Sequence, residues 1–157
     1  MAQVRAGATV EDLYRVEGKA EIVNGELVLM SPTGFLPGRA GGAIYRSLLA
    51  YEEKTGGGYA FPDNVGFVVR LPNRRSFSPD AAFYVGEPCE GKFLDGAPVF
   101  AAEVRSEDDY GPAAERRLAA KRADYFAAGT QVVWDVDLLR DEVVRSYAAA
   151  RPDEPRL

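Results

Sequence analysis

Residues 20–30, AEIVNGELVLM, constrain the fold of this chain more than any other segment. Two apolar runs flank Asn24-Gly25, and Asn-Gly is preferred in two-residue hairpin turns because both positions tolerate a positive φ. The segment therefore predicts an antiparallel β-hairpin. Just before it, Thr9 is a favourable helix cap and Glu11 and Asp12 suit a first helical turn, which predicts a short helix ahead of the hairpin.

The rest of the chain alternates between helical and strand-like patterns. Apolar residues at helical spacing predict one helix from about residue 40 to the glycines at 56–58 and another over 112–128, ended by Gly129. Runs rich in β-branched and aromatic residues predict strands within 59–71, 80–85, 99–105, 131–137 and 142–147. This order predicts a mixed α/β fold with a single domain over residues 1–150 and a flexible tail over 151–157.

Two residue counts restrict the chemistry. The 157 residues include no histidine and one cysteine, Cys89. This excludes mechanisms that need an imidazole, such as serine or cysteine triads and His-ligated zinc. A metal site would have to use mainly carboxylate and backbone oxygens, which favours Mg²⁺ or Mn²⁺ as the cofactor.

Charge and hydropathy bear on location and partners. The apolar stretches are shorter than the roughly 18 residues needed to span a membrane, and residues 1–14 lack the apolar centre of a signal peptide. We therefore expect a cytoplasmic protein with no membrane partner. With a net charge of −5, contact with nucleic acid must rely on a local basic patch.

Carboxylates on two predicted strands are the candidates for that metal chemistry. Alternation along 99–105 puts Glu103 and Arg105 on the same side, so Arg105 could simply neutralise Glu103. Asp80 stands at the start of the preceding strand. Two carboxylates at neighbouring strand ends could share one divalent ion, whereas a Pro-Asp pair is equally common as an ordinary turn.

Four separated motifs then occur in one order: EIVNGELVLMSP, SPDAAFYV, FAAEVRS and KRADYFAAGTQVVWDVD. In this combination the chain resembles the Uma2 family, also called DUF820, of endonucleases in the PD-(D/E)XK superfamily. The resemblance extends over about residues 9–147. It implies a restriction-endonuclease-like fold, in which helices flank a mixed β-sheet.

The resemblance also implies a catalytic set. Asp80 and Glu103 would be the metal ligands, and the superfamily's lysine, replaced here by Arg105, would be supplied by Lys121 on the following helix. Helical phase does not choose between Lys121 and Arg122, but only a lysine can lose a proton as well as act by charge. Glu26 matches the glutamate of the family's Gly-Glu-Leu motif and is a third candidate metal ligand.

The implied activity is metal-dependent hydrolysis of phosphodiester bonds in nucleic acid, with DNA as the expected substrate. Arg70, Arg74, Arg75 and Arg105 are the candidate phosphate contacts. Homodimerisation would fit duplex cleavage, which needs two active sites. The alternative is an inactive nuclease-fold module that binds nucleic acid or protein. Arg105 favours that alternative, as does 37–39, Pro-Gly-Arg, where the family often carries a histidine.

Overall fold

The computed structural model describes residues 7–157. Residues 1–6, which belong to the predicted domain and to the N-terminal segment considered for a signal peptide, lie outside the described residues. Within 7–157 the chain forms three helices, α1 (Val10–Tyr14), α2 (Phe35–Thr55) and α3 (Pro112–Ala127). None of them is long and apolar enough to cross a membrane.

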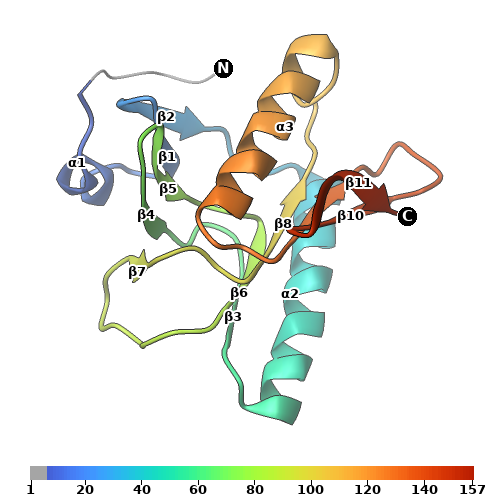
Figure 1. Cartoon of the computed structure of the whole chain (residues 1–157), viewed down its shortest axis with the longest axis horizontal. Helices are drawn as coiled ribbons and strands as arrows, with labels where there is room; N and C mark the ends of the chain where they lie inside the picture. The colour runs from blue at the N-terminus through green and yellow to red at the C-terminus, as the bar shows by residue number, and fades with distance from the viewer. Residues whose placement is uncertain (1–6) are drawn as a thin grey trace.

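The strands of residues 7–157 form two sheets (Figure 1). The first has the order β2-β1-β5-β4-β7, with β1 (Lys19–Val23), β2 (Glu26–Met30), β4 (Phe67–Leu71), β5 (Arg74–Phe77) and β7 (Leu94–Asp95). The second has the order β11-β10-β9-β8-β6-β3, with β3 (Tyr59–Phe61), β6 (Ala81–Tyr84), β8 (Phe100–Val104), β9 (Val132–Val136), β10 (Val144–Ala148) and β11 (Arg151–Arg156).

The predicted hairpin is present. β1 and β2 pair antiparallel from Lys19 opposite Met30 to Val23 opposite Glu26. The turn residues Asn24 and Gly25 have φ values of 52° and 73°, as an Asn-Gly turn requires. The turn fixes the register, and the register decides which side chains of β1 face the interior.

The second sheet is mixed. β6 and β8 are antiparallel, whereas β8 and β9 are parallel and are joined through α3. A parallel pair needs such a crossover, because the chain must return to the starting edge of the sheet. As a result, α3 lies beside β8, the strand that carries Glu103.

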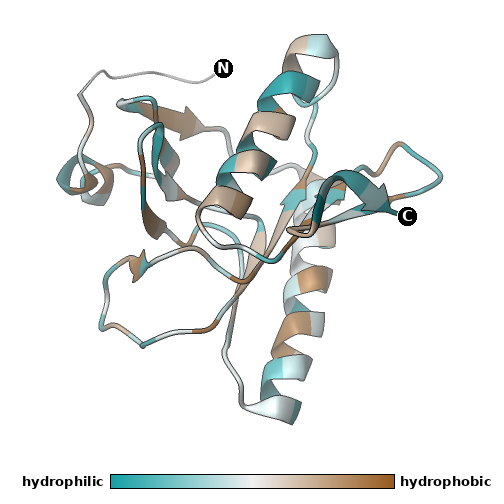
Figure 2. Cartoon of the chain, viewed as in Figure 1, coloured by the Kyte–Doolittle hydropathy of each residue, from teal (hydrophilic) through white to brown (hydrophobic). Residues whose placement is uncertain are grey.

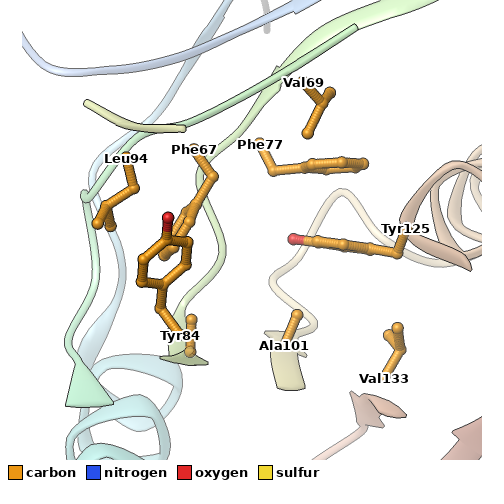
Figure 3. Packing of buried hydrophobic residues seen from close by; sticks show 9 residues of the cluster. Phe67, Val69, Phe77, Tyr84, Leu94, Ala101, Tyr125 and Val133 are labelled. Atoms are coloured by element: carbon orange, nitrogen blue, oxygen red, sulfur yellow. The ribbon is translucent and has the colours of Figure 1, made fainter. Parts of the chain in front are cut away.

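One apolar cluster joins the two sheets and α3 (Figure 3). Tyr125 of α3 is fully buried and stacks on Phe77 of β5, with ring centroids 3.9 Å apart. Ala101 of β8 and Val133 of β9 complete this contact from the second sheet. The packing fixes the position of α3 relative to both sheets, so it also fixes the polar side chains on the same helix turn.

Three sequence-based expectations differ from the structure. Residues 151–156, expected to be flexible, form the edge strand β11; its prolines are tolerated because an edge strand needs fewer backbone donors. The residues of this strand are mostly hydrophilic, as Figure 2 shows, so the sequence carries no apolar strand pattern there. α2 begins at Phe35 because Pro37 falls in its first turn, where no N–H donor is required. The region 59–71 contains two strands instead of one, and β5 was not predicted.

Candidate active site

Asp80 lies immediately before β6 and is tied to the end of β8. Ala81 pairs with Ala102, and continuing that register by one residue brings Asp80 level with Glu103. The backbone N–H of Asp80 donates to the carbonyl of Ala102 at 3.0 Å. Its Oδ2 accepts from the backbone N–H of Val104 at 2.6 Å. The carboxylate of Asp80 is therefore held at the carboxyl end of the strand that carries Glu103.

Glu103 faces α3 and is bound by two side chains of that helix. Lys121 Nζ lies 2.8 Å from Glu103 Oε1, and the Tyr125 hydroxyl donates to Oε2 at 2.7 Å. Lys121 and Tyr125 are four residues apart, one helical turn, and therefore point the same way. The expectation that Arg105 could neutralise Glu103 is therefore wrong. The partners of Glu103 are the Lys121 ammonium and the Tyr125 hydroxyl.

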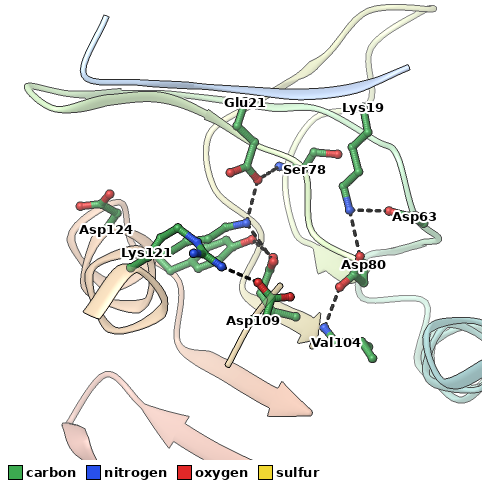
Figure 4. A network of polar contacts seen from close by, with 12 residues as sticks. Lys19, Glu21, Asp63, Ser78, Asp80, Val104, Asp109, Lys121 and Asp124 are labelled. Carbon is green, nitrogen blue, oxygen red and sulfur yellow. Dashed lines mark hydrogen bonds and ion pairs between the residues drawn. The ribbon is translucent and has the colours of Figure 1, made fainter. Parts of the chain in front are cut away.

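Lys121 forms an ion pair with a second carboxylate, that of Glu21, which sequence reasoning missed. Glu21 Oε2 of β1 lies 2.9 Å from Lys121 Nζ. Glu21 is only 2% exposed, and it also accepts from the backbone N–H of Ser78 at 2.6 Å and from Arg74 Nη1 at 2.9 Å. The Lys121 ammonium thus bridges two carboxylates from different sheets, those of Glu21 and Glu103. Figure 4 shows Lys121 beside Glu21.

Lys19, also missed, gives Asp80 an ammonium partner of its own. Its Nζ lies 2.9 Å from Asp80 Oδ1 and 2.7 Å from Asp63 Oδ1. Lys19 and Glu21 are two residues apart on β1 and therefore share the face that looks into the site. Two charged residues at alternate positions of an apolar hairpin strand are the signal that could have identified both.

The electrostatics follow from this arrangement. Burial, together with the negative charges of Asp80 and Glu21, raises the pKa of Glu103 above its ordinary value. Burial would also raise the pKa of Glu21, but the charges of Lys121 and Arg74 outweigh it and the pKa is lowered. Burial would lower the pKa of Lys121, but Glu103 and Glu21 outweigh it and the pKa is raised. Lys121 is therefore a charged ammonium in this geometry.

Comparison with known proteins places the chain in a family. The model of the Uma2 family, described as "Putative restriction endonuclease", matches residues 9–153. The chain belongs to the Uma2 family. No curated protein matches it. The predicted resemblance to Uma2 is confirmed.

A solved structure agrees with this assignment at the level of the fold. A crystal structure described as that of a "putative nuclease belonging to DUF820", from Anabaena variabilis ATCC 29413, has a TM-score of 0.67 and 17% sequence identity. The match covers 95% of this chain and 83% of the other. The restriction-endonuclease-like α/β fold, with mixed sheets flanked by helices, is therefore confirmed.

In this Uma2 chain the choice between the two basic residues of α3 is resolved by geometry. Arg122 points to β9 and β10: its Nη1 lies 3.6 Å from Asp135 Oδ2, and its guanidinium lies 4.2 Å from the ring centroid of Tyr147. Lys121 is the α3 cation that reaches Glu103. The predicted convergence of Lys121 and Glu103 is present, whereas their catalytic role stays a prediction.

Two of the four arginines predicted to contact phosphate are internal. Arg74 is 5% exposed and binds Glu21 and Asp124. Arg105 is 3% exposed, and its guanidinium binds Asp135 and Glu115. Both guanidiniums are buried and held in ion pairs inside the protein, so neither is free to bind substrate. The prediction that Arg74 and Arg105 contact phosphate therefore needs correction.

The other two arginines, Arg70 and Arg75, are exposed. Arg70 lies on β4 and Arg75 on β5. Arg70 pairs with Asp95 at 2.8 Å, while Arg75 has no such partner among residues 7–157. They remain candidates for phosphate contacts.

Glu26 is not brought to the site. It stands at the turn end of β2, opposite Val23, and β2 is an outer strand of its sheet. Its side chain makes no hydrogen bond or ion pair with another of residues 7–157. Its position in the Gly-Glu-Leu motif reflects the hairpin turn, and the buried acid from this hairpin is Glu21 instead.

The donor chemistry fits a hard divalent cation at Asp80 and Glu103. Two neighbouring ion-pair networks meet there. Lys19 binds Asp63 and Asp80, while Arg74 and Lys121 bind Glu21, Asp124 and Glu103, which makes five carboxylates and three cations in all. Two negative charges are therefore in excess, which suits a divalent ion bound by oxygen. Within residues 7–157 no three His, Cys, Asp or Glu side chains gather as a metal cluster, so two carboxylates would be the side-chain ligands.

Proposed function

We propose that the chain is a metal-dependent endonuclease that hydrolyses phosphodiester bonds in DNA. The observation that carries the proposal is the contact of the Lys121 ammonium with Glu103, 2.8 Å long, beside the strand end where Asp80 is anchored. Membership of the Uma2 family supports nuclease chemistry in general. The metal requirement and the preference for DNA are the further parts of the proposal.

Asp80 and Glu103 would hold the Mg²⁺ or Mn²⁺ ion. When bound, the ion supplies positive charge to the phosphoryl oxygen and lowers the pKa of a water molecule. Lys19 must give up its contact with Asp80 Oδ1 for that oxygen to become a ligand, and Asp63 would retain the displaced ammonium. The excess of two negative charges over the two ion-pair networks supports this exchange.

The side chains around Glu103 have separate tasks in this proposal. Lys121, held protonated by Glu21 and Glu103, donates to a non-bridging phosphate oxygen as negative charge develops there. The Tyr125 hydroxyl keeps Glu103 in position. In the reaction the oxygen of water forms a bond to phosphorus and the phosphorus–oxygen ester bond breaks. The attacking water gives up one proton to solvent, and the leaving oxygen takes up one proton from solvent.

Plasmid nicking tests the proposal. Supercoiled DNA is incubated with Mg²⁺ and with the wild type, Asp80→Asn, Glu103→Gln or Lys121→Gln. Glu107→Gln is a matched control, because Glu107 is exposed beyond the end of β8. We expect the three site variants to lose at least a hundredfold in rate, a loss typical of removed electrostatic or acid–base groups. The control should keep wild-type activity. Equal nicking by all five proteins would overturn the proposal.

A second function is favoured by one observation. All four carboxylate oxygens of Asp80 and Glu103 already accept from internal donors, namely Lys19, the Val104 N–H, Lys121 and Tyr125. A site closed in this way suits a nuclease-fold module that binds nucleic acid without cleaving it. Retention of oligonucleotide binding, with no Mn²⁺ uptake by calorimetry at millimolar metal, would support that function over the enzyme.

A further inference from the structure

A cavity opens beside Asp80, on the side of α2. Its volume is about 160 Å³, and its walls include Thr33, Gly38, Gly41, Gly42, Asp63 and Asp80. This is room for about five water molecules, each of which takes about 30 Å³ in the liquid. The cavity therefore has space for a group larger than water next to a carboxylate of the candidate active site.

The packing of the protein does not account for two of the three glycines that line this cavity, Gly38 and Gly42. Gly38 and Gly42 have no positive φ, so the helical backbone does not require them. A Cβ at Gly42 would meet nothing within 4 Å, and one at Gly38 would meet only Thr33 Cγ2 at 3.8 Å. Each glycine inside a helix costs about 1 kcal/mol relative to alanine. The chain keeps space here that its own side chains do not use.

An exposed aromatic and two unpaired arginines lie on the same face of α2 as Gly42, which is one of the residues that line the cavity. Phe35, in the first turn of α2, is 80% exposed. Arg39 follows it by four residues and Arg46 follows Gly42 by four, so each pair shares a face of the helix. Both arginines are exposed, and neither makes an ion pair or hydrogen bond with its side chain among residues 7–157. We call Phe35, Arg39, Gly42 and Arg46 the α2 flank.

The charge of this region contrasts with that of the whole chain. Between Glu26 and Glu52 the only charged residues are Arg39 and Arg46, although the net charge of the chain is −5. Two helical turns, about 10.5 Å, separate these arginines, a rise that corresponds to about three nucleotides along one DNA strand. The flank therefore suits a polyanion with regularly spaced charges, and the exposed Phe35 offers a surface on which a base can stack.

We propose that the α2 flank carries one strand of the nucleic-acid substrate to Asp80. Arg39 and Arg46 contact phosphates of that strand, Phe35 stacks on a base, and the cavity holds the sugar or base next to the scissile phosphate. The proposal rests on the proposed nuclease function and names the surface by which the substrate enters. In this proposal Arg39 and Arg46 take the role of phosphate contacts that was predicted for Arg74 and Arg105, which are paired inside the protein.

Binding of a fluorescein-labelled single-stranded oligonucleotide in EDTA tests the arginines separately from cleavage. The Arg39→Gln/Arg46→Gln variant is compared with the wild type and with Lys92→Gln/Arg156→Gln, an equal charge change at exposed positions elsewhere. Each lost phosphate contact lowers the slope of log Kd against log salt by about 0.7 for single strands. We expect a slope lower by about 1.4 for the flank variant. The ratio of its Kd to the wild-type Kd should therefore be about 25 times larger at 0.1 M than at 1 M salt. The control should match the wild type.

Gly42 provides the test of the cavity. A side chain at Gly42 would enter open space, so Gly42→Leu should fill the cavity and raise the Kd at least tenfold without lowering the Tm. If the wild type binds and cleaves DNA but the flank and cavity variants behave like it, the assignment of α2 is overturned while the nuclease stands. If the wild type neither binds nor cleaves nucleic acid, the proposed function itself falls. If Phe35→Ala turns a dimer into a monomer with unchanged oligonucleotide binding, the flank is an interface between copies and the proposal is likewise overturned.

Discussion

Replacement of Lys121 by methionine removes the ammonium between two carboxylates while keeping an unbranched side chain only one heavy atom shorter. Glu21 is 2% exposed, and Glu103 lies against it across the 2.9 Å and 2.8 Å contacts to Lys121. Removing one partner of a buried ion pair costs about 3–5 kcal/mol because it leaves an uncompensated buried charge. For a domain of this size about 1 kcal/mol corresponds to about 2–4 °C in Tm. Lys121→Met should therefore lower the Tm by about 6–20 °C at pH 7.5.

A second substitution separates this electrostatic cause from a packing defect. In Lys121→Met/Glu103→Gln one uncompensated charge is gone, and the glutamine carbonyl can still accept from the Tyr125 hydroxyl. We expect the double variant to melt several degrees above the single variant, measured by circular dichroism without added metal. Lys92→Met, at an exposed position, should melt like the wild type. A double variant that melts below the single variant would refute the bridging account of Lys121.

Three further predictions concern neighbouring groups. Tyr125→Phe should keep the stack on Phe77 but cost about 1.5–3 kcal/mol, because Glu103 loses a buried hydrogen bond; thermal melting measures the loss. Arg105→Lys should destabilise the fold by a similar amount, since an ammonium cannot reproduce a two-nitrogen contact with Asp135. For Asp137, burial opposes a low pKa, but a backbone N–H, a tyrosine hydroxyl and an arginine outweigh it and the pKa is lowered. The stability it contributes is complete above its unfolded pKa of 3.8 and is lost as the pH falls through the lower folded value, so acid titration of Asp137→Asn should show a shallower loss than wild type.

Local patterns predicted the parts of the site that depend on neighbouring residues in the chain. The hairpin followed from Asn24-Gly25 because a turn type is set by its own residues. Glu103 was found because an acid on an apolar strand is unusual, and Lys121 because of the family resemblance. Helical spacing alone left Lys121 and Arg122 equivalent, and only the positions of Glu21 and Asp135 distinguish them.

What the sequence could not supply were the partners that arrive from distant strands. Arg74 and Arg105 looked like surface cations because the acids that bury them come from other elements: Glu21 is 53 residues from Arg74, and Asp135 is 30 residues from Arg105. Lys19 and Glu21 were overlooked because a hairpin strand with one solvated face carries charges at the same spacing. Whether such a face is solvated or buried depends on the sheet packing, which no local pattern encodes.

Calorimetric titration of Mn²⁺ into the wild type, Asp80→Asn and Glu103→Gln is the most direct test of the central claim, that these two side chains bind one divalent ion. We predict one ion per chain for the wild type and at least tenfold weaker binding for each variant. An equal affinity in all three proteins, or no uptake by the wild type at millimolar Mn²⁺, would contradict the claim.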